Sequence, residues 1–364
     1  MNSPSSIRVA VVGCGQIADL HIAEIQKIAG AQLVAVCDAN EIMAEQAAVR
    51  FGVPKFYTDF ERLLKEQQPA VVHITTPPQS HLALGKLAVE SGAHAYIEKP
   101  FTVDAKEAQE LVACAERAGK QVCVGHNFNF DRAAVEAREL VAAGRLGEIR
   151  HVDSVFSYNL KGAFGRILFE KPKHWIHRLP GKLFHNVISH AAYNVTDYID
   201  DPMPEIHAVG FKLRETLLGD QRDAFNDELR VLIRGQRCTG NIVFSSHIRP
   251  MHHYMRLHGT KGTVHVDFNA RTVSFEHAST LPGALGRLAL PFSYARDQIG
   301  HSFGNVTRFA KADLQFNDGM NRLFRTFYQA VRDGKPSPIP MTEAVRVTRI
   351  LDEIFRQAQP DPDK

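Results

Sequence analysis

The stretch that decides the fold is residues 8–18, RVAVVGCGQIA. Its apolar run ends at Gly13, and a pattern typical of a helix begins within the next few residues. A strand, a glycine turn and a helix in this order are the context of a dinucleotide-binding site. In such a site Gly13 would permit the tight turn, Gly15 would let the backbone approach a pyrophosphate, and Ala18 would let the helix pack closely on the strand. The alternative is an ordinary tight turn between a strand and a helix.

A carboxylate at the end of the next strand favours the dinucleotide site. Asp38 follows the apolar run 33–37 and stands 20 residues after Ala18, where it would accept hydrogen bonds from the adenosine ribose hydroxyls. The N–H groups of Gln16 and Ile17 would then face the phosphates at the positive end of the helix dipole. No arginine stands next to Asp38 to accommodate a 2′-phosphate, so we expect NAD and not NADP.

Composition excludes several classes of protein. The 364 residues exceed the usual size of one core, so we expect two domains, 1–125 and 126–364. A net charge of +3 does not indicate a nucleic-acid partner, and no apolar run is long enough to span a membrane. Five cysteines without a C-x-x-C pair predict reduced core residues, no metal site and a cytoplasmic location.

Residues 7–125 alternate six expected strands with five expected helices. Continuous apolar strands such as 70–74 suit a parallel sheet that is covered on both faces, which predicts a doubly wound α/β domain. Ligands bind such sheets at the carboxyl ends of their strands, so polar residues there are candidates for the site. These candidates are Thr75, Thr76, Pro77 and His81 after the fourth strand, Glu98 and Lys99 after the fifth, and His126 and Asn127 after the sixth.

The glycine turn, Thr76-Pro77-x-x-x-His81 and Glu98-Lys99-Pro100 together resemble the Gfo/Idh/MocA family of glucose–fructose oxidoreductases and inositol dehydrogenases. The resemblance covers nearly the whole chain. It implies that Lys99 lies beside the nicotinamide and the reacting carbinol, and that Glu98 and the turn 75–77 line the cofactor. It also implies a second α/β domain, built on a large and mostly antiparallel sheet through which dimers or tetramers form.

Residues 126–364 fit such a second domain, because alternating patterns such as 229–234 predict strands with one wet and one buried face. A helix is expected to begin near Lys182, with Asn186, His190 and Tyr193 on one face. His190 matches the histidine that the resemblance places in the active site, and Asn186 stands where the family has an acid. Since asparagine cannot act as a carboxylate base, we expect His190 to take the proton, Lys99 to donate to the carbinol oxygen, and Asn186 to orient substrate.

Two further stretches stay open to alternative interpretations. The basic connection 161–182 holds six lysines and arginines, with Trp175 and Arg178 as candidate substrate contacts. It is either a solvated loop or a lid that binds an anionic substrate. The apolar stretch 281–310 is expected to be an irregular insertion that forms an oligomer contact or a cleft wall and not a membrane anchor.

The residues and the resemblance together leave three functions. The favoured one is an NAD-dependent dehydrogenase that acts on a secondary alcohol or ketone of a sugar-like substrate, with an anionic sugar nucleotide or uronate as the first expectation. The second is an NAD-dependent glycoside hydrolase or lyase without net redox change. The third is an NAD-binding regulator without chemistry, which the asparagine at 186 would permit.

Overall fold

The computed structural model describes residues 6–162, 165, 171, 173–213, 226–277, 283–310 and 317–358. Contacts divide the chain into a first unit, residues 1–127 with 319–349, and a second unit, residues 128–318 with 350–364. The domain boundary expected at residue 125 stays a prediction. The two units differ from it because residues 319–349 belong to the first unit.

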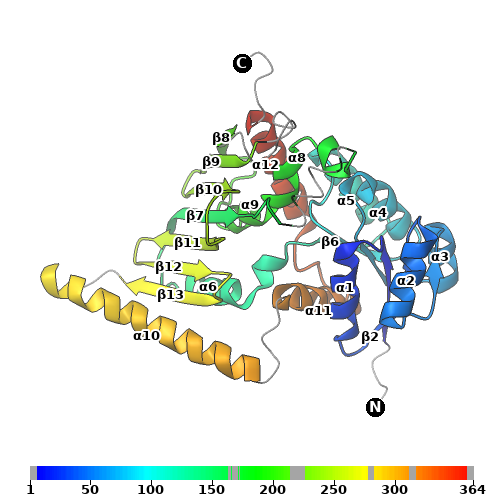
Figure 1. Ribbon diagram of the computed structural model, residues 1–364, viewed down its shortest axis with the longest axis horizontal. Helices are drawn as coiled ribbons and strands as arrows, with labels where there is room; N and C mark the ends of the chain where they lie inside the picture. Colours follow the sequence, from blue (N-terminus) through cyan, green and yellow to red (C-terminus); the bar gives the residue numbers. More distant parts are fainter. Residues whose placement is uncertain are drawn as a thin grey trace. The chain divides into compact units, whose positions relative to one another are not determined.

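The first unit is built on a six-stranded parallel sheet in the order β3-β2-β1-β4-β5-β6, which lies in the blue to cyan part of the chain in Figure 1. This order is that of a doubly wound fold, in which helices connect successive parallel strands and cover both faces. The predicted fold class is therefore confirmed for this unit. Its elements are β1 (Ile7–Val12), α1 (Gln16–Gln26), β2 (Ala31–Cys37), α2 (Glu41–Phe51), β3 (Phe56–Tyr57), α3 (Phe60–Gln67), β4 (Val71–Ile74), the 3₁₀ turn Pro78–Ser80, α4 (His81–Glu90), β5 (His94–Ile97), α5 (Ala105–Arg117), β6 (Val122–Val124) and α11 (Asp318–Asp333).

Helix α11 joins the first unit although it lies close to the end of the chain. Its Asn321 side chain donates to Glu24 of α1, with Nδ2 2.9 Å from Oε2, and its buried Phe324 packs edge-on against His73 of β4. The amphipathic pattern of α11 predicts a helix, but it does not indicate which surface of the protein the helix covers.

The second unit is built on a seven-stranded sheet in the order β13-β12-β11-β7-β10-β9-β8. Among the described strands of this sheet only β7 and β10 pair in parallel, so the predicted mostly antiparallel sheet is confirmed. Helix α9 packs on one face of the sheet through β7 and β10. The elements are the 3₁₀ turn Asn127–Phe130, α6 (Arg132–Ala142), β7 (Ile149–Ser157), the 3₁₀ turn Trp175–Arg178, α8 (Lys182–Val187), α9 (Ser189–Thr196), β8 (Glu205–Phe211), β9 (Glu228–Arg234), β10 (Thr239–Ser245), β11 (His253–Gly259), β12 (Gly262–Asp267), β13 (Thr272–His277), α10 (Gly283–Ala310) and α12 (Met341–Ala358), whose first half belongs to the first unit.

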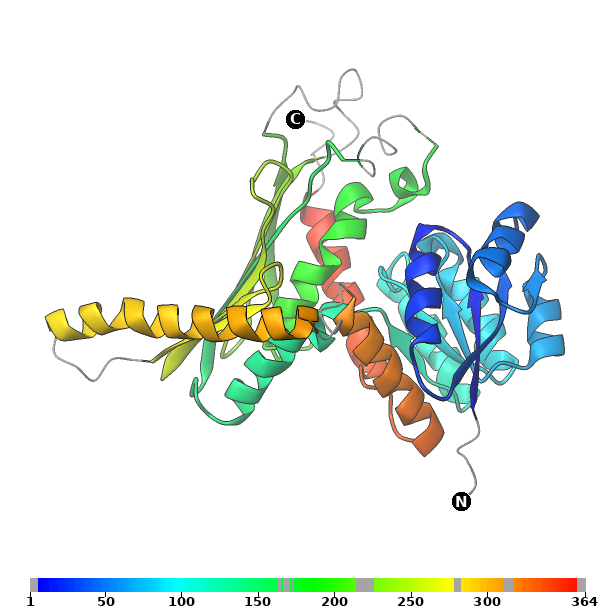
Figure 2. The ribbon, with the colours of Figure 1, turned by 60° about the horizontal axis from the view of Figure 1, so that its bottom comes forward.

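The stretch expected to be an irregular insertion is a helix. Residues 283–310 form α10, a helix of 28 residues that runs beside β13 (Figure 2). Four glycines and Pro291 lie within these bounds, and such residues argue against a helix when the sequence is considered alone. Among the described helices, none combines the length and the apolar character that crossing a membrane requires.

Candidate functional site

The glycine turn at the end of β1 is fixed by its own neighbours. Gly13 has φ +92°, and a Cβ atom there would lie 2.6 Å from Thr76 Cγ2, so only glycine fits. Thr75, which is buried, donates its hydroxyl to the carbonyl of Gly13 at 2.6 Å. The turn after β1 and the turn after β4 therefore support each other at the carboxyl edge of the sheet.

Gly15 differs from Gly13 because nothing in the described part of the protein demands a glycine there. Its φ of −76° suits any residue, and no described atom lies within 4 Å of the place where a Cβ would stand. Gly15 is also the N-cap of α1, and no side chain caps the helix there. Open space over an uncapped helix N-terminus is what a bound pyrophosphate requires, so this turn fits a dinucleotide.

Asp38 holds the same turn from the end of β2. Its Oδ2 accepts the N–H of Cys14 at 2.7 Å, and its Oδ1 accepts the N–H of Asn40 at 2.8 Å. Each carboxylate oxygen has a second lone pair, so Asp38 can accept ribose hydroxyls while it keeps both backbone contacts. Its half-exposed position leaves room for that interaction.

His81 lies beneath the predicted cofactor loops. Its ring is fully buried, with Nε2 2.8 Å from the carbonyl of Thr76 and Nδ1 3.1 Å from the carbonyl of Pro100. Burial lowers the pKa of His81, although the backbone carbonyls oppose this shift. The imidazole thus ties the loop after β4 to the loop after β5.

Glu98 was expected to line the cofactor, but the structure turns its carboxylate toward the interior. Its Oε1 lies 2.8 Å from His21 Nε2 of α1, and its Oε2 accepts the N–H of Lys99 at 3.1 Å. Burial would raise the pKa of Glu98, but the interactions with His21 and Lys99 together outweigh this effect, and the net pKa is lowered. The carboxylate is therefore held ionised inside the unit.

A chain of buried hydrogen bonds continues from Glu98 to α11. His21 Nδ1 lies 3.0 Å from His73 Nδ1, and His73 Nε2 lies 2.7 Å from the Tyr328 hydroxyl. His21, His73 and Tyr328 are all 0% exposed, and burial lowers the pKa of His73 well below its ordinary value. In the arrangement with both rings neutral, every group has a partner: Tyr328 donates to His73, His73 to His21, and His21 to Glu98. Sequence reasoning missed these three residues, which no motif marks.

Lys99 follows β5 and is half-buried. Burial lowers the pKa of its ammonium group, while the charge of Glu98 opposes this shift. Gly125 permits the arrangement, since a Cβ there would lie 3.1 Å from Glu98 Oε1 and 3.4 Å from Lys99 N. The neighbouring His126 is buried, which lowers its pKa to about 3, and Asn127 is half-buried.

In the second unit, His190 is half-buried at the start of α9. Its Nδ1 lies 2.8 Å from the Tyr193 hydroxyl, which also accepts the N–H of Phe128 at 3.1 Å. The ring of His190 packs edge-on against Phe128, with centroids 4.8 Å apart. Tyr193 was expected to contact substrate, but it is 1% exposed and holds the imidazole of His190 instead.

The helix expected to begin near Lys182 is broken at Ile188 into α8 and α9. Asn186 is half-buried on α8 and His190 is half-buried on α9, and Ile188 between the two helices keeps helical backbone angles. In the basic connection, Trp175 is half-buried and Arg178 is exposed. Arg166, one of its six lysines and arginines, lies outside the described residues.

The structure thus brings together most of the predicted cofactor residues at the carboxyl edge of one sheet. Lys99 and His190 belong to different units, and their predicted cooperation on one substrate stays a prediction.

Two family models match this chain. Residues 7–126 match the oxidoreductase family with an NAD-binding Rossmann fold, and residues 134–265 match the Gfo/Idh/MocA C-terminal domain. The chain belongs to the Gfo/Idh/MocA family. This membership confirms the resemblance noted in the sequence and NAD as the expected cofactor.

Similar proteins include 1-carboxy-3-chloro-3,4-dihydroxycyclo hexa-1,5-diene dehydrogenase of Comamonas testosteroni, which is 34% identical over 149 residues, 41% of this chain and 38% of the relative. A glycosyl hydrolase family 109 protein of Streptomyces filamentosus is 26% identical over 286 residues, 71% of this chain and 57% of the relative. Both matches thus span less than two thirds of the relative's own length. The crystal structure of the WlbA dehydrogenase of Bordetella pertussis in complex with NADH and UDP-GlcNAcA has a TM-score of 0.76 at 19% identity and covers 98% of this chain and 97% of its own. At that identity the likeness shows the fold alone.

Proposed function

We propose that this protein is an NAD-dependent dehydrogenase that acts on a secondary alcohol or ketone of a sugar-like substrate. The observation that carries the proposal is the glycine turn, where Gly15 leaves open space over an uncapped helix and Asp38 faces the same turn. NAD, when bound, supplies the hydride acceptor. Lys99 stands at the end of β5, at the same edge of the sheet.

The chain's own residues would then handle the proton and the substrate. Lys99 donates a hydrogen bond to the carbinol oxygen, and His190 takes the hydroxyl proton as general base. For this role Nδ1–H of His190 donates to the Tyr193 hydroxyl, which leaves the lone pair of Nε2 for the proton. Tyr193 is thus a positioning residue. Asn186, which carries no charge, orients the substrate.

We further propose that the substrate is anionic, with a sugar nucleotide or uronate as first choice. Of the described cations of the basic connection, Lys161, Lys171, Lys173 and Arg178 are exposed and Lys182 is half-buried. Charge contacts in water weaken as salt is added, because the Debye length falls to about 8 Å at physiological ionic strength. KM should therefore rise severalfold between about 20 and 150 mM salt. Efficient turnover of a neutral sugar with a KM independent of salt would contradict an anionic substrate.

A second candidate function is supported by the glycosyl hydrolase family 109 relative, whose match covers 71% of this chain. In that case the substrate would lose its aglycone without net formation of NADH. The test is to incubate the enzyme and NAD with a panel of uronates, sugar nucleotides and nitrophenyl glycosides, and to record NADH absorbance and nitrophenol release together. Net NADH supports the dehydrogenase, and nitrophenol without NADH supports the hydrolase. If neither signal appears although NAD binds tightly, the remaining function is an NAD-binding regulator without chemistry.

We also propose a cytoplasmic location, which is supported by five cysteines that are all buried and unpaired. Association through the open face of the second unit's sheet stays a prediction.

A further inference from the structure

Helix α10 packs on its own unit through polar side chains. Asp297 accepts the N–H of Phe275 in β13 at 3.1 Å, and Gln298 donates to Ser274 at 2.9 Å. Tyr294 donates to Glu276 at 2.6 Å. The described half-buried positions of α10 are polar or small residues, namely Gly286, Ser293, Asp297, His301, Gly304, Asn305 and Arg308.

The opposite face of α10 is apolar and faces water. Its large side chains expose between 57% and 76% of their surface. This arrangement inverts the usual one, in which an amphipathic helix buries its apolar stripe and exposes its polar face. We call this surface the α10 stripe; it consists of Leu285, Leu288, Phe292, Ile299, Phe303, Val306 and Phe309.

The spacing of the stripe is that of a helix pair. The positions 285, 288, 292, 295, 299, 302, 306 and 309 alternate steps of three and four residues, and six of the seven stripe residues stand on them, while Phe303 lies beside position 302. Such a repeat is the seam of a coiled coil, in which each helix inserts its side chains between those of its partner. None of these eight positions is charged, so two identical stripes meet without like charges opposed along the seam.

The exposed area also suits a second copy of the chain. An aromatic side chain buries about 150–250 Å², so the exposed parts of Phe292, Phe303 and Phe309 amount to on the order of 450 Å², to which the four aliphatic side chains of the stripe add. A stable interface buries about 800 Å² on each partner. A twofold axis presents the same surface on both copies, so a single stripe suffices for a closed dimer.

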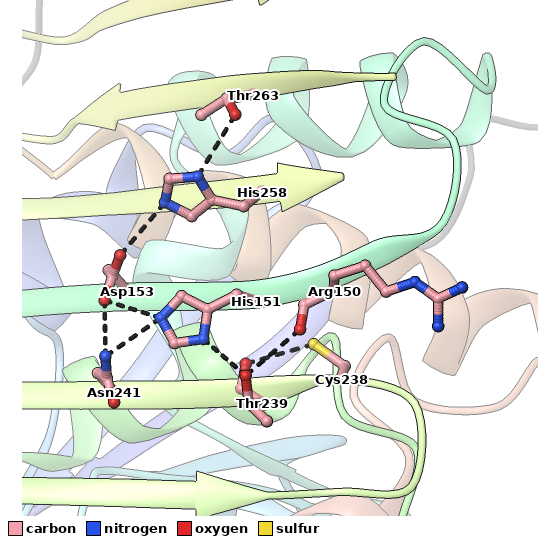
Figure 3. Close-up of polar contacts among 8 residues, drawn as sticks. All are labelled: Arg150, His151, Asp153, Cys238, Thr239, Asn241, His258 and Thr263. Atoms are coloured by element: carbon pink, nitrogen blue, oxygen red, sulfur yellow. Dashed lines mark hydrogen bonds and ion pairs between the residues drawn. The ribbon is translucent and has the colours of Figure 1, made fainter. Parts of the chain in front are cut away.

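The open face of the sheet next to α10 has a different character. Asp153 of β7 accepts from Asn241 at 3.0 Å, and its oxygens lie 3.1 Å from His151 and 3.2 Å from His258 (Figure 3). Burial would raise the pKa of Asp153, but the hydrogen bonds from Asn241 and His151 lower it overall. The polar groups of this cluster already bind one another, whereas the α10 stripe leaves apolar surface in water.

We propose that two copies of this chain pair through the α10 stripe, seam against seam, to form a homodimer. The apolar face of α10 is then buried, and the polar contacts to β13 fix the direction in which each unit presents it.

The test is the mass of the full-length protein in solution, measured by sedimentation equilibrium from about 0.1 to 50 μM. We expect a dimer of the wild type. The double substitution Phe292→Asp with Phe303→Asp should raise the dimer dissociation constant at least 100-fold, about 2.7 kcal/mol. Phe303→Leu keeps the α10 stripe apolar, and this variant should stay a dimer. Val49→Asp is the matched control, because Val49 is 76% exposed on α2 outside the stripe.

Circular dichroism and NAD affinity establish that each variant folds. A wild type that stays monomeric at 50 μM overturns the proposal, and this result needs no variant. A dimer that persists in the double variant also overturns it and places the contact elsewhere, for instance on the open sheet face. Dissociation of Val49→Asp to the same extent would show that any added charge separates the copies, which equally contradicts a role for the stripe.

Discussion

Replacement of Asp38 by alanine should weaken NAD binding for two separable reasons. The first is the loss of the carboxylate that we expect to accept the ribose hydroxyls. A hydrogen bond to a charged group contributes about 1.5–3 kcal/mol, which corresponds to a loss of about 10- to 100-fold in affinity. The second is the loss of the contact that holds the N–H of Cys14 at 2.7 Å, which loosens the turn between Gly13 and Gly15.

Calorimetric titration with NAD and with NADP measures both effects. Asp38→Asn is the control, because its amide oxygen can still accept the N–H of Cys14 although the charge is gone. We expect Asp38→Asn to bind NAD more tightly than Asp38→Ala does. We also expect it to discriminate less against NADP, since the carboxylate no longer repels a 2′-phosphate. An NAD affinity of Asp38→Ala within threefold of the wild type would refute this reasoning, as would a wild type that binds NADP as tightly as NAD.

Two further predictions concern the histidines. His190→Ala should lower kcat by about 10²- to 10⁴-fold while NAD binds normally, since a general base contributes that much. A single-turnover rate within threefold of the wild type would remove His190 from the mechanism. The free energy of unfolding should fall as the pH drops below about 6.5, because burial lowers the pKa of His126 and of His253 to about 3 while the unfolded histidines bind protons. Each of the two histidines should lower the free energy of unfolding by about 1 kcal/mol between pH 6.5 and 5.5. Equal urea midpoints of unfolding at the two pH values would contradict this expectation.

The sequence predicts the first unit well because local signals and the fold agree there. A glycine at φ +92° after β1 and continuous apolar strands each point to the same parallel sheet. The sequence predicts α10 badly. Its glycines and Pro291 argue against a helix, and its apolar face points outward, unlike that of a helix that packs on its own domain. The break at Ile188 likewise leaves no local mark, because the apolar stripe continues through it.

The buried hydrogen-bonded chain shows where sequence reasoning about the site ends. Tyr328 and His73 are 255 residues apart, and their contact depends on where α11 packs. This buried chain of hydrogen bonds also involves the Glu98-Lys99-Pro100 motif. Glu98 has one oxygen on His21 and the other on the N–H of Lys99, so its carboxylate serves the interior of the unit. In the pair Glu98-Lys99, the glutamate therefore anchors the strand end.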